Sequence, residues 1–300
     1  MIHGTHNAED DKRNDDILIF INGAFIKRSE AKISVFDSGY LVGDGIWEGI
    51  RLHHGRLVFI EDHLNRLWQA AQTTSIQLPF TKEELVKNIL DTVAKNKMID
   101  KVHIRVMITR GIKKTPSQDP RLTLSGPNLV IIAEHKKASP NTLKKGITLF
   151  TSTIRRGSPD YLDPKLNCHS KIHEVQALIQ AIEAGADEAL MLDINGFVST
   201  CNATNFFIVR HNEVWTSTDA YCMNGITRSK VIDLCHKNKI ICIEKRFSLY
   251  DVYSADEAFV TGTFGALTPV SRIDGKLIGN FDLPLTKRLQ VLYNELIMRA

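Results

Sequence analysis

Residues 152–208 read STIRRGSPDYLDPKLNCHSKIHEVQALIQAIEAGADEALMLDINGFVSTCNATNFFI and hold the pattern that decides the fold. A β-branched run ends in a loop that is rich in Gly, Pro and Asp and that carries Lys165, and Ser170 then opens a helix. Apolar residues recur at helical spacing, at Ile172, Val175, Leu178, Ile179 and Ile182. Gly185 stands where a left-handed residue commonly ends a helix. We therefore predict a lysine-bearing loop followed by one helix.

Two strands are predicted after this helix, at 188–192 and 205–209. An Asn195-Gly196 turn and the polar run 199–205 stand between them, and Asn-Gly is a strong hairpin signal. A second Asn-Gly pair, at 22–23, predicts another hairpin near the N-terminus. The sequence thus mixes hairpins with helices, and it contains no internal repeat.

The size and hydropathy of the chain set its class. It has 300 residues, of which 43% are hydrophobic, and this is enough for one large or two medium cores, so we expect two domains. No apolar stretch reaches the roughly 20 residues that a membrane span needs, and the N-terminus lacks the apolar core of a signal peptide. We expect a cytoplasmic protein that does not associate with a membrane.

Charge and cysteine content argue against two classes of partner. The net charge of +4 is small and dispersed, whereas a nucleic-acid surface needs clustered Lys and Arg, so no nucleic-acid partner is predicted. Small anionic ligands remain compatible with this charge. The five cysteines are odd in number and lack paired metal spacing, which favours free thiols over disulfides or zinc. We predict no metal site.

Composition also predicts the domain boundaries. Residues 1–16 are polar and aperiodic, which is typical of a flexible tail. Residues 134–146 are charged, contain Pro and Gly, and separate two strong strands, so they form the predicted linker. A smaller N-terminal α/β domain is then expected over 17–133, and a larger C-terminal domain over 147–300.

Three motifs mark the N-terminal domain. The glycine-rich segment GDGIWEGIR occupies 43–51 and contains Trp47. Arg66 lies in the segment HLNRL on a helix predicted from about 61 to 76. Along the strand that begins at Val102, apolar residues alternate with polar ones, so Arg105 points away from the apolar face, and Arg110 follows the strand.

Two motifs mark the C-terminal domain. The segment NGITR occupies 224–228 just before an apolar-periodic helix, and Thr227 is predicted as its N-cap. A helix N-terminus with unpaired backbone N–H groups is a ready anion site. The segment TGTFGALTPV, 261–270, follows a strand, and its glycines let the backbone approach a ligand closely.

These motifs, in this order, resemble those of the fold-type IV pyridoxal-phosphate enzymes, the family of the branched-chain and D-amino-acid aminotransferases. The resemblance is greatest to the branched-chain group and covers about residues 17–298. It implies an α/β fold of the α+β type, with two domains, the cofactor in the crevice between them, and a homodimer. It also implies an aminotransferase that moves an amino group between a branched-chain-like amino acid and a 2-oxo acid.

The resemblance implies roles for single residues. Lys165 would hold pyridoxal 5′-phosphate as a Schiff base and shuttle the substrate's α-proton. The other residues implied to bind the cofactor, most of them at its phosphate, are Arg66, Thr200, Gly225, Ile226, Thr227, Gly262 and Thr263. Those implied to bind the substrate are Trp47, Arg105, Arg110 and Phe264. In branched-chain aminotransferases the match of Arg105 receives the distal carboxylate of glutamate or 2-oxoglutarate, and in the D-amino-acid enzymes an arginine at the position of Arg110 grips the α-carboxylate.

The sequence departs from the family at the ring of the cofactor. Thr200 stands where relatives place the glutamate that pairs with the pyridine nitrogen, and a hydroxyl cannot keep that nitrogen protonated as a carboxylate does. Ser170 is nearest to the place of the tyrosine that often contacts the ring hydroxyl. Ala266 replaces a second glutamate, a change that we do not interpret. Weaker electron withdrawal by the ring is expected.

The position of the lysine leaves alternatives open. With the spacing of the D-amino-acid enzymes, Asn167 takes the catalytic place and the chain is a catalytically degenerate homologue. Lys171 falls inside the start of the helix and suits the role less well than Lys165. A related lyase or racemising enzyme is the other alternative. The amino acid and its chirality depend on the shape of the pocket.

Overall fold

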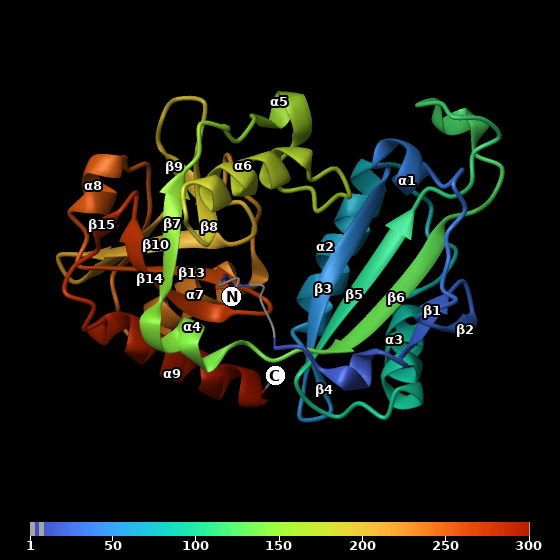
Figure 1. The fold of residues 1–300 in the computed structure, drawn as a ribbon, viewed down its shortest axis with the longest axis horizontal. Helices are drawn as coiled ribbons and strands as arrows, with labels where there is room; N and C mark the ends of the chain where they lie inside the picture. Colours follow the sequence, from blue (N-terminus) through green and yellow to red (C-terminus); the bar gives the residue numbers. More distant parts are fainter. Residues whose placement is uncertain (1–3, 6–8, 300) are drawn as a thin grey trace. The chain divides into compact units, whose positions relative to one another are not determined.

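Two β-sheets organise the chain, one in each of two compact units (Figure 1). The structure is a computed structural model that describes residues 4–5 and 9–299. The N-terminal unit holds residues 9–137 and 167–171, and the C-terminal unit holds residues 4–5, 138–166 and 172–299. The mixed α/β fold with two units agrees with the predicted fold class.

The N-terminal unit is built on a six-stranded antiparallel sheet with the order β2-β1-β6-β5-β3-β4. Its strands are β1 (Leu18–Ile21), β2 (Ala24–Lys27), β3 (Gly45–His53), β4 (Arg56–Val58), β5 (Val102–Thr109) and β6 (Asn128–His135). Its helical segments are η1 (Lys12–Asn14), α1 (Ser38–Val42), α2 (Ile60–Thr73), α3 (Lys82–Lys95) and η2 (Pro120–Leu122). Helix α2 packs against β3, and α3 packs against β1 and β6.

Local sequence explains much of this unit. Along β5, Val102, Ile104 and Val106 are fully buried, while Arg105 between them is exposed, so the predicted alternation is confirmed. The predicted capping box of α3 is also confirmed, because the Thr81 side chain accepts from the Glu84 N–H and the Glu84 side chain accepts from the Thr81 N–H.

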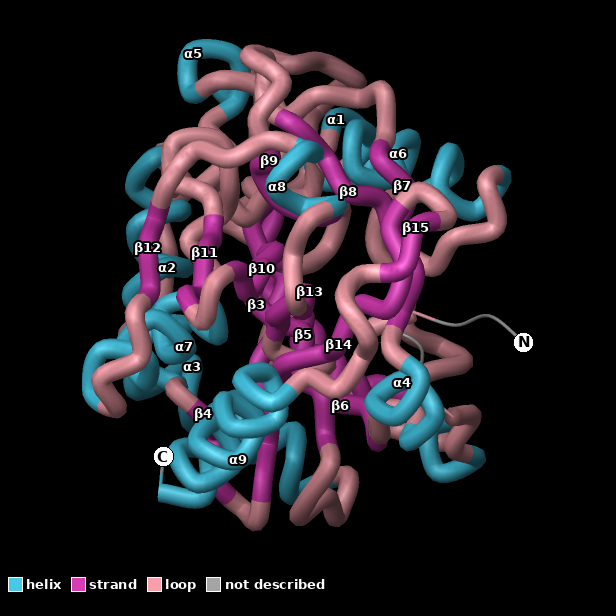
Figure 2. Tube along the Cα trace, turned by 90° about the vertical axis from the view of Figure 1, so that its left-hand side faces the viewer, coloured by secondary structure: helices cyan, strands magenta, loops and turns pink. Residues whose placement is uncertain are grey.

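The C-terminal unit is built on a nine-stranded mixed sheet with the order β12-β11-β10-β13-β14-β7-β8-β9, in which β15 also pairs with β14. Its strands are β7 (Ile147–Thr151), β8 (Glu188–Leu192), β9 (Val198–Cys201), β10 (Asn205–Arg210), β11 (Glu213–Thr216), β12 (Cys242–Glu244), β13 (Glu257–Gly262), β14 (Ala266–Ile273) and β15 (Lys276–Leu277). Strand β7 runs parallel to β8 and β14, and β11 runs parallel to β12, beside which it lies in Figure 2.

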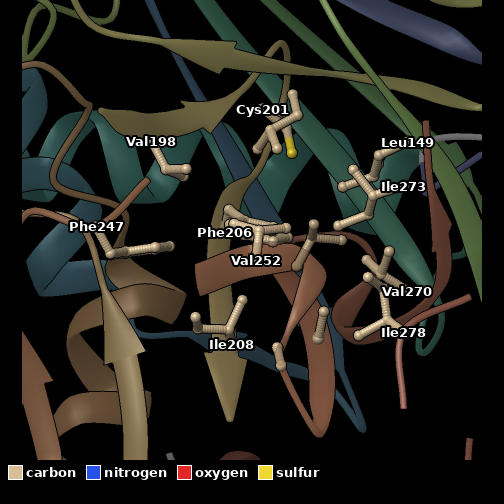
Figure 3. Close-up of a cluster of buried hydrophobic side chains, with 14 of the residues drawn as sticks. Leu149, Val198, Cys201, Phe206, Ile208, Phe247, Val252, Val270, Ile273 and Ile278 are labelled. Atoms are coloured by element: carbon tan, nitrogen blue, oxygen red, sulfur yellow. The ribbon is translucent and has the colours of Figure 1, made fainter. Parts of the chain in front are cut away.

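The helices of this unit are α4 (Pro140–Lys145), α5 (Pro159–Leu162), α6 (Ile172–Glu183), α7 (Ile226–Lys237), α8 (Leu249–Tyr253) and α9 (Pro284–Arg299). Helix α6 packs on β7 and β8, while α7 and α9 pack on each other and on β13. The main core of the unit is one apolar cluster in which Phe206 lies close to Val252 (Figure 3). Phe206 and Ile208 anchor β10 in this core, directly after the polar turn that follows β9.

Helix α6 forms where the sequence predicts a helix, but its apolar stripe is exposed. Ile172, Val175, Ile179 and Ile182 are 62%, 48%, 48% and 60% exposed. The buried face consists of Ala177 and Ala181, which pack against Ala189 and Met191 of β8. Small alanines let the helix approach the strand closely, so the larger residues are left on the surface.

Strand β9 covers the start of the segment 199–205, which the sequence predicts as a polar run without a strand. Its side chains are buried because local hydrogen bonds satisfy them. The Ser199 hydroxyl donates to the Tyr221 carbonyl at 2.7 Å, and the Thr200 hydroxyl donates to the Thr204 carbonyl at 2.7 Å. The polar composition of this segment therefore did not predict the buried strand β9.

The predicted linker and tail hold more regular structure than their composition suggests. Residues 134–146 contain the end of β6 and all of α4, and residues 167–171 belong to the N-terminal unit. In the tail, residues 1–3 and 6–8 lie outside the described residues, but Thr5 is buried and donates through its N–H and its hydroxyl to Glu188. Within 4–5 and 9–299, no helix combines the length and the apolar character that crossing a membrane requires.

One buried ion cluster joins α2 to β3. Glu48 is 1% exposed, and its two carboxylate oxygens accept from the Arg66 guanidinium at 2.7 and 2.8 Å. His63 Nδ1 lies 2.7 Å from the same carboxylate. Burial by itself raises the pKa of the Glu48 carboxyl, but the charge and hydrogen bonds of Arg66, with those of His63, bring that pKa below its ordinary value. The cluster therefore keeps Glu48 ionised.

Glu48→Gln should test this cluster, because it removes the charge and keeps the volume. The lowered folded-state pKa means that the contribution of Glu48 to stability is present above the ordinary value of 4.5 and is lost as the pH falls through the folded-state pKa. We expect Glu48→Gln to lower the free energy of unfolding by roughly 2–4 kcal/mol at pH 7. The difference from the native chain should shrink below pH 4.5, as measured by urea unfolding.

The control is Glu30→Gln, which changes an exposed glutamate of the same unit. A Glu48→Gln chain as stable as the native one at pH 7, or a difference that does not change with pH, would show that the charge of Glu48 does not hold the cluster.

Candidate functional site

The first turn of α7 is an open helix N-terminus in the C-terminal unit. Gly225 is the N-cap and has no side chain with which to accept from the turn, and the N–H groups of Ile226 and Thr227 have no partner within the helix. The predicted N-cap, Thr227, is wrong, because the helix begins at Ile226 and Thr227 lies inside its first turn. The Thr227 hydroxyl is buried 3.4 Å from the Tyr293 hydroxyl of α9. This turn can receive an anion.

Asn205 fixes the backbone that leads into this turn. A Cβ atom on Gly225 would lie 2.0 Å from Asn205 Oδ1, far inside contact distance. The Asn205 amide in turn donates to the Met223 carbonyl at 2.9 Å, and the Gly225 N–H donates to the same carbonyl at 2.8 Å. Only glycine therefore fits at 225 without displacing a buried side chain.

A second glycine-bearing turn joins β13 to β14. The hairpin closes with Gly262 opposite Ala266, so Thr263, Phe264 and Gly265 form the loop between them. Phe264 is buried, Thr263 is half-buried, and Ala266 has a left-handed φ of 50°. Because α7 packs on β13, the predicted residues Gly262 and Thr263 and the first turn of α7 belong to neighbouring elements of one unit.

Thr200 has its hydroxyl proton engaged within the protein. It lies on β9, is 5% exposed, and donates to the Thr204 carbonyl at 2.7 Å. The Thr204 hydroxyl donates in turn to buried Glu188 at 3.0 Å. While this arrangement persists, the Thr200 oxygen can accept a hydrogen bond but cannot donate a second one. Its role at a cofactor ring stays a prediction.

Lys165 lies in the C-terminal unit on the loop between α5 and residues 167–171, and it faces solvent. Its side chain is 45% exposed, and Nζ lies 3.0 Å from the Asp219 carboxylate, which is 50% exposed. The hydrogen bond to Asp219 raises the pKa of Lys165, and the bond from Lys165 lowers the pKa of Asp219. The paired lysine is therefore an ammonium, whereas addition to a carbonyl needs the neutral amine.

Asn167, the alternative to Lys165, is used to extend the N-terminal sheet. It is 2% exposed, and its amide donates to the Trp47 carbonyl at 2.7 Å, while the Trp47 N–H donates to the Asn167 carbonyl at 3.0 Å. Asn167 Oδ1 is buried and has no hydrogen-bond partner among the described residues. An amide nitrogen is not a nucleophile for a carbonyl, so Asn167 cannot take the place of a lysine. Lys171, the third candidate, stands directly before the first residue of α6.

The three predicted arginines of the N-terminal unit differ in their surroundings. Arg66 is held by both oxygens of Glu48. Arg110 binds both oxygens of Asp44, at 2.6 and 3.0 Å, and also donates to two backbone carbonyls of the segment after α2. Arg105 is exposed, with its guanidinium 4.0 Å from the centre of the Trp47 ring. Of these arginines, Arg105 thus presents its charge at the surface beside an aromatic ring.

The sequence did not point to the acidic partners of these side chains. Asp44 lies 66 residues from Arg110, and Asp219 is likewise far along the chain from Lys165. No periodicity relates positions so far apart, and only the tertiary fold brings them together. Asp44 and Glu48 had a signal, since both stand inside the glycine-rich segment 43–51.

Known proteins of similar sequence cover almost the whole chain. The family model for amino-transferase class IV matches residues 45–273. Branched-chain-amino-acid aminotransferase-like protein 2 of Arabidopsis thaliana is 40% identical over 284 residues, which are 94% of this chain and 51% of that protein. A putative branched-chain-amino-acid aminotransferase of Methanocaldococcus jannaschii is 37% identical over 93% of this chain and 96% of its own length. The chain thus spans about half the length of the Arabidopsis relative.

The fold has a close counterpart among solved structures. The branched-chain amino acid aminotransferase of T.th., in complex with N-(5′-phosphopyridoxyl)-L-glutamate, superposes with a TM-score of 0.87 at 29% identity over 95% of each chain. The sequence match and the match of the fold agree with each other. The chain belongs to the class IV aminotransferase family.

Proposed function

We propose that this chain binds pyridoxal 5′-phosphate and transfers an amino group between an amino acid and a 2-oxo acid. The observation that carries the proposal is the open first turn of α7, where Gly225 has no room for a side chain against Asn205. A relative of the same fold was solved with a phosphopyridoxyl amino acid, which supports the same cofactor here. The branched-chain enzymes among the relatives support a branched-chain-like substrate.

The residues of the C-terminal unit fit the phosphate of this cofactor. A dianion is stabilised by unpaired N–H groups at a helix N-terminus, and Ile226 and Thr227 supply such groups. The hydroxyl of Thr227 adds a donor, and we assign Gly262 and Thr263 of the neighbouring hairpin to the same phosphate. Arg66 of the N-terminal unit is proposed as a further phosphate ligand, oriented by its two bonds to Glu48.

Lys165 is proposed as the lysine that carries the cofactor and moves the proton at the substrate's α-carbon. Bound pyridoxal phosphate supplies the aldehyde that takes up an amino group and a conjugated ring that stabilises negative charge. Asp219 holds Lys165 as an ammonium, so Nζ must leave Asp219 and lose a proton before it can act. Thr200 is proposed to face the ring nitrogen and, lacking a carboxylate, to leave the ring a weaker electron sink.

Arg105 is our proposed ligand for a substrate carboxylate. It is exposed and stacks over Trp47, whereas Arg110 is already bound by Asp44. A guanidinium beside an indole ring can grip a carboxylate while the ring covers an aliphatic side chain. Phe264 and Trp47 are the predicted apolar contacts of the substrate. The cytoplasmic location also stays a prediction.

A homodimer is supported by the exposed stripe on α6. Four large aliphatic side chains lie on one face of this helix, at Ile172, Val175, Ile179 and Ile182. Isolated apolar residues are common on protein surfaces, but a contiguous stripe more often marks an interface. We therefore propose that two copies of the chain associate through α6.

The lysine assignment can be tested by chemical labelling. The full chain is incubated with pyridoxal phosphate, reduced with borohydride and mapped by peptide mass spectrometry. The pyridoxyl group should be found on Lys165, and Lys165→Ala should lose it, while Lys171→Ala, the control, keeps it. Label on Lys171, or none in a native chain that is folded, would contradict the assignment. If Lys165 is the lysine that carries the cofactor, the new lysine of Asn167→Lys should carry no pyridoxyl group.

Gly225→Ala should weaken cofactor binding, because the added Cβ would displace Asn205 and disturb the first turn of α7. We expect the dissociation constant for pyridoxal phosphate to rise at least about tenfold, or 1.4 kcal/mol, in an absorbance titration. Gly126→Ala is the matched control, since nothing lies within 4 Å of its Cβ position. Equal affinities in the two variants would mean that α7 does not hold the phosphate.

Val175→Glu should separate the dimer, because it places a charge in the middle of the proposed interface. Val175 is 48% exposed in the single chain, so the monomer should fold with nearly native stability. Light scattering after size exclusion should give a dimer for the native chain and a monomer for Val175→Glu. Gln176→Glu, which adds the same charge beside the stripe, should stay dimeric. A native monomer, or a Val175→Glu dimer as stable as the native one, would refute this interface.

A further inference from the structure

Two imidazoles and a carboxylate meet at one edge of the N-terminal unit. They belong to His53 and His54, in the turn between β3 and β4, and to Asp100, in the connection from α3 to β5. One ligand atom of each side chain lies within 4.8 Å of the other two. His53 Nδ1 and Asp100 Oδ1 are 3.1 Å apart, and the two imidazole ring centres are 4.3 Å apart.

The backbone holds these three side chains together. His54 and Gly55 have left-handed φ values of 47° and 77° between paired residues of β3 and β4, as in a type I′ hairpin turn. The His54 N–H donates to Asp100 Oδ1 at 3.0 Å, and the Gly55 N–H donates to the Ile99 carbonyl at 2.8 Å. The turn and the α3–β5 connection are thus joined by main-chain bonds, so little ordering remains for a ligand to impose.

We propose that His53, His54 and Asp100 bind a divalent transition-metal ion, of which Zn²⁺ is the representative. Two neutral imidazoles with one carboxylate suit Zn²⁺, Ni²⁺ or Cu²⁺, whereas Mg²⁺ and Ca²⁺ prefer oxygen ligands alone. Two ligands at 2.0–2.1 Å from one ion in a tetrahedron stand about 3.3 Å apart, close to the observed 3.1 Å pair. Three protein ligands leave the fourth position to water.

The charge around the cluster is mixed. Arg51 lies two residues before His53 on β3, and its guanidinium donates to the Lys136 carbonyl at 3.0 Å. A cation so near lowers the affinity for a second cation, and Asp100 is the carboxylate that opposes it within the cluster. Asp100 is therefore expected to matter for binding as much as the imidazoles do.

The cluster lies at the opposite end of β3 from Gly45 and Trp47, which contact residues 167–171. Six residues of strand separate Trp47 from His53, or roughly 20 Å at the rise of a β-strand. Within the N-terminal unit, the proposed metal site is thus distant from Trp47, which is proposed to contact the substrate, and its test uses no residue assigned to the cofactor or the substrate. The sequence predicts no metal site because Asp100 is 46 residues from His54 and the cysteine spacing carries no signal.

A second hairpin of this chain provides a matched control. His211, in the turn between β10 and β11, has a left-handed φ of 53°, and its N–H donates to the Asp256 carboxylate at 3.0 Å. The backbone arrangement of His54 and Asp100 is repeated there, but the residue before His211 is Arg210, whereas His53 precedes His54. Among residues 4–5 and 9–299, His53, His54 and Asp100 are the one such three-ligand group.

The experiment titrates Zn²⁺ into the full chain by calorimetry, after removal of any affinity tag. The native chain should bind one ion, and His54→Asn and Asp100→Asn should each weaken binding at least tenfold. Asparagine tolerates a left-handed φ, and the amide oxygen at 100 can still accept from the His54 N–H, so both variants should fold. His211→Asn should bind as the native chain does.

Thermal unfolding provides a second readout. Without metal, all four chains should unfold at similar temperatures, and Zn²⁺ should raise the midpoint of the native chain and of His211→Asn only. Failure of the native chain to bind Zn²⁺ would overturn the proposal. Equal weakening in His54→Asn and His211→Asn would overturn it too, since it would show scattered binding by surface histidines.

Discussion

The buried carboxylate of Glu257 sets the frame of the C-terminal unit. It lies on β13, is 3% exposed, and accepts the N–H groups of Leu285 and Thr286 at 2.9 and 2.8 Å. The first turn of α9 is thereby bonded by a carboxyl group of the protein itself, and α9 in turn brings Tyr293 against the first turn of α7. The N-cap of α7 is Gly225, which has no side chain with which to cap this helix. Of these two helices packed on β13, α9 has its first turn bonded by Glu257, and α7 is the one that we propose to receive the phosphate.

In the N-terminal unit, carboxylates also accept pairs of N–H groups, but there they orient arginine side chains. Both carboxylate oxygens of buried Glu48 accept hydrogen bonds from Arg66. Those of half-buried Asp44 accept hydrogen bonds from Arg110, so both guanidinium groups are held in place. A guanidinium fixed in this way keeps one orientation, which suits the contact proposed between Arg66 and a phosphate better than an adaptable contact with substrates. The exposed Arg105, stacked on Trp47, keeps more freedom to follow substrates of different length.

Local patterns in the sequence predicted the elements well, and contacts between them poorly. The alternation along β5 and the capping box of α3 depend on neighbours two to four residues away, so both were predicted correctly. The stripe on α6 predicted a helix but not which face is buried, because periodicity does not reveal that alanines pack more closely on β8. The partners of Lys165 and Arg110 come from distant segments, and the tertiary fold rather than local sequence determines them.

The proposed role of Lys165 depends on how strongly Asp219 holds this side chain. The two side chains are 45% and 50% exposed, and an exposed ion pair contributes only about 0–1 kcal/mol. A covalent bond to an aldehyde held by the phosphate site can readily offset so small a term. The bonds of Asn167 are of another kind, since it is buried in main-chain pairing with Trp47 and has no amine to offer. We therefore favour Lys165 over Asn167 as the residue that carries the cofactor. The ion pair of Lys165 is weak and reversible, whereas no rearrangement can give Asn167 an amine.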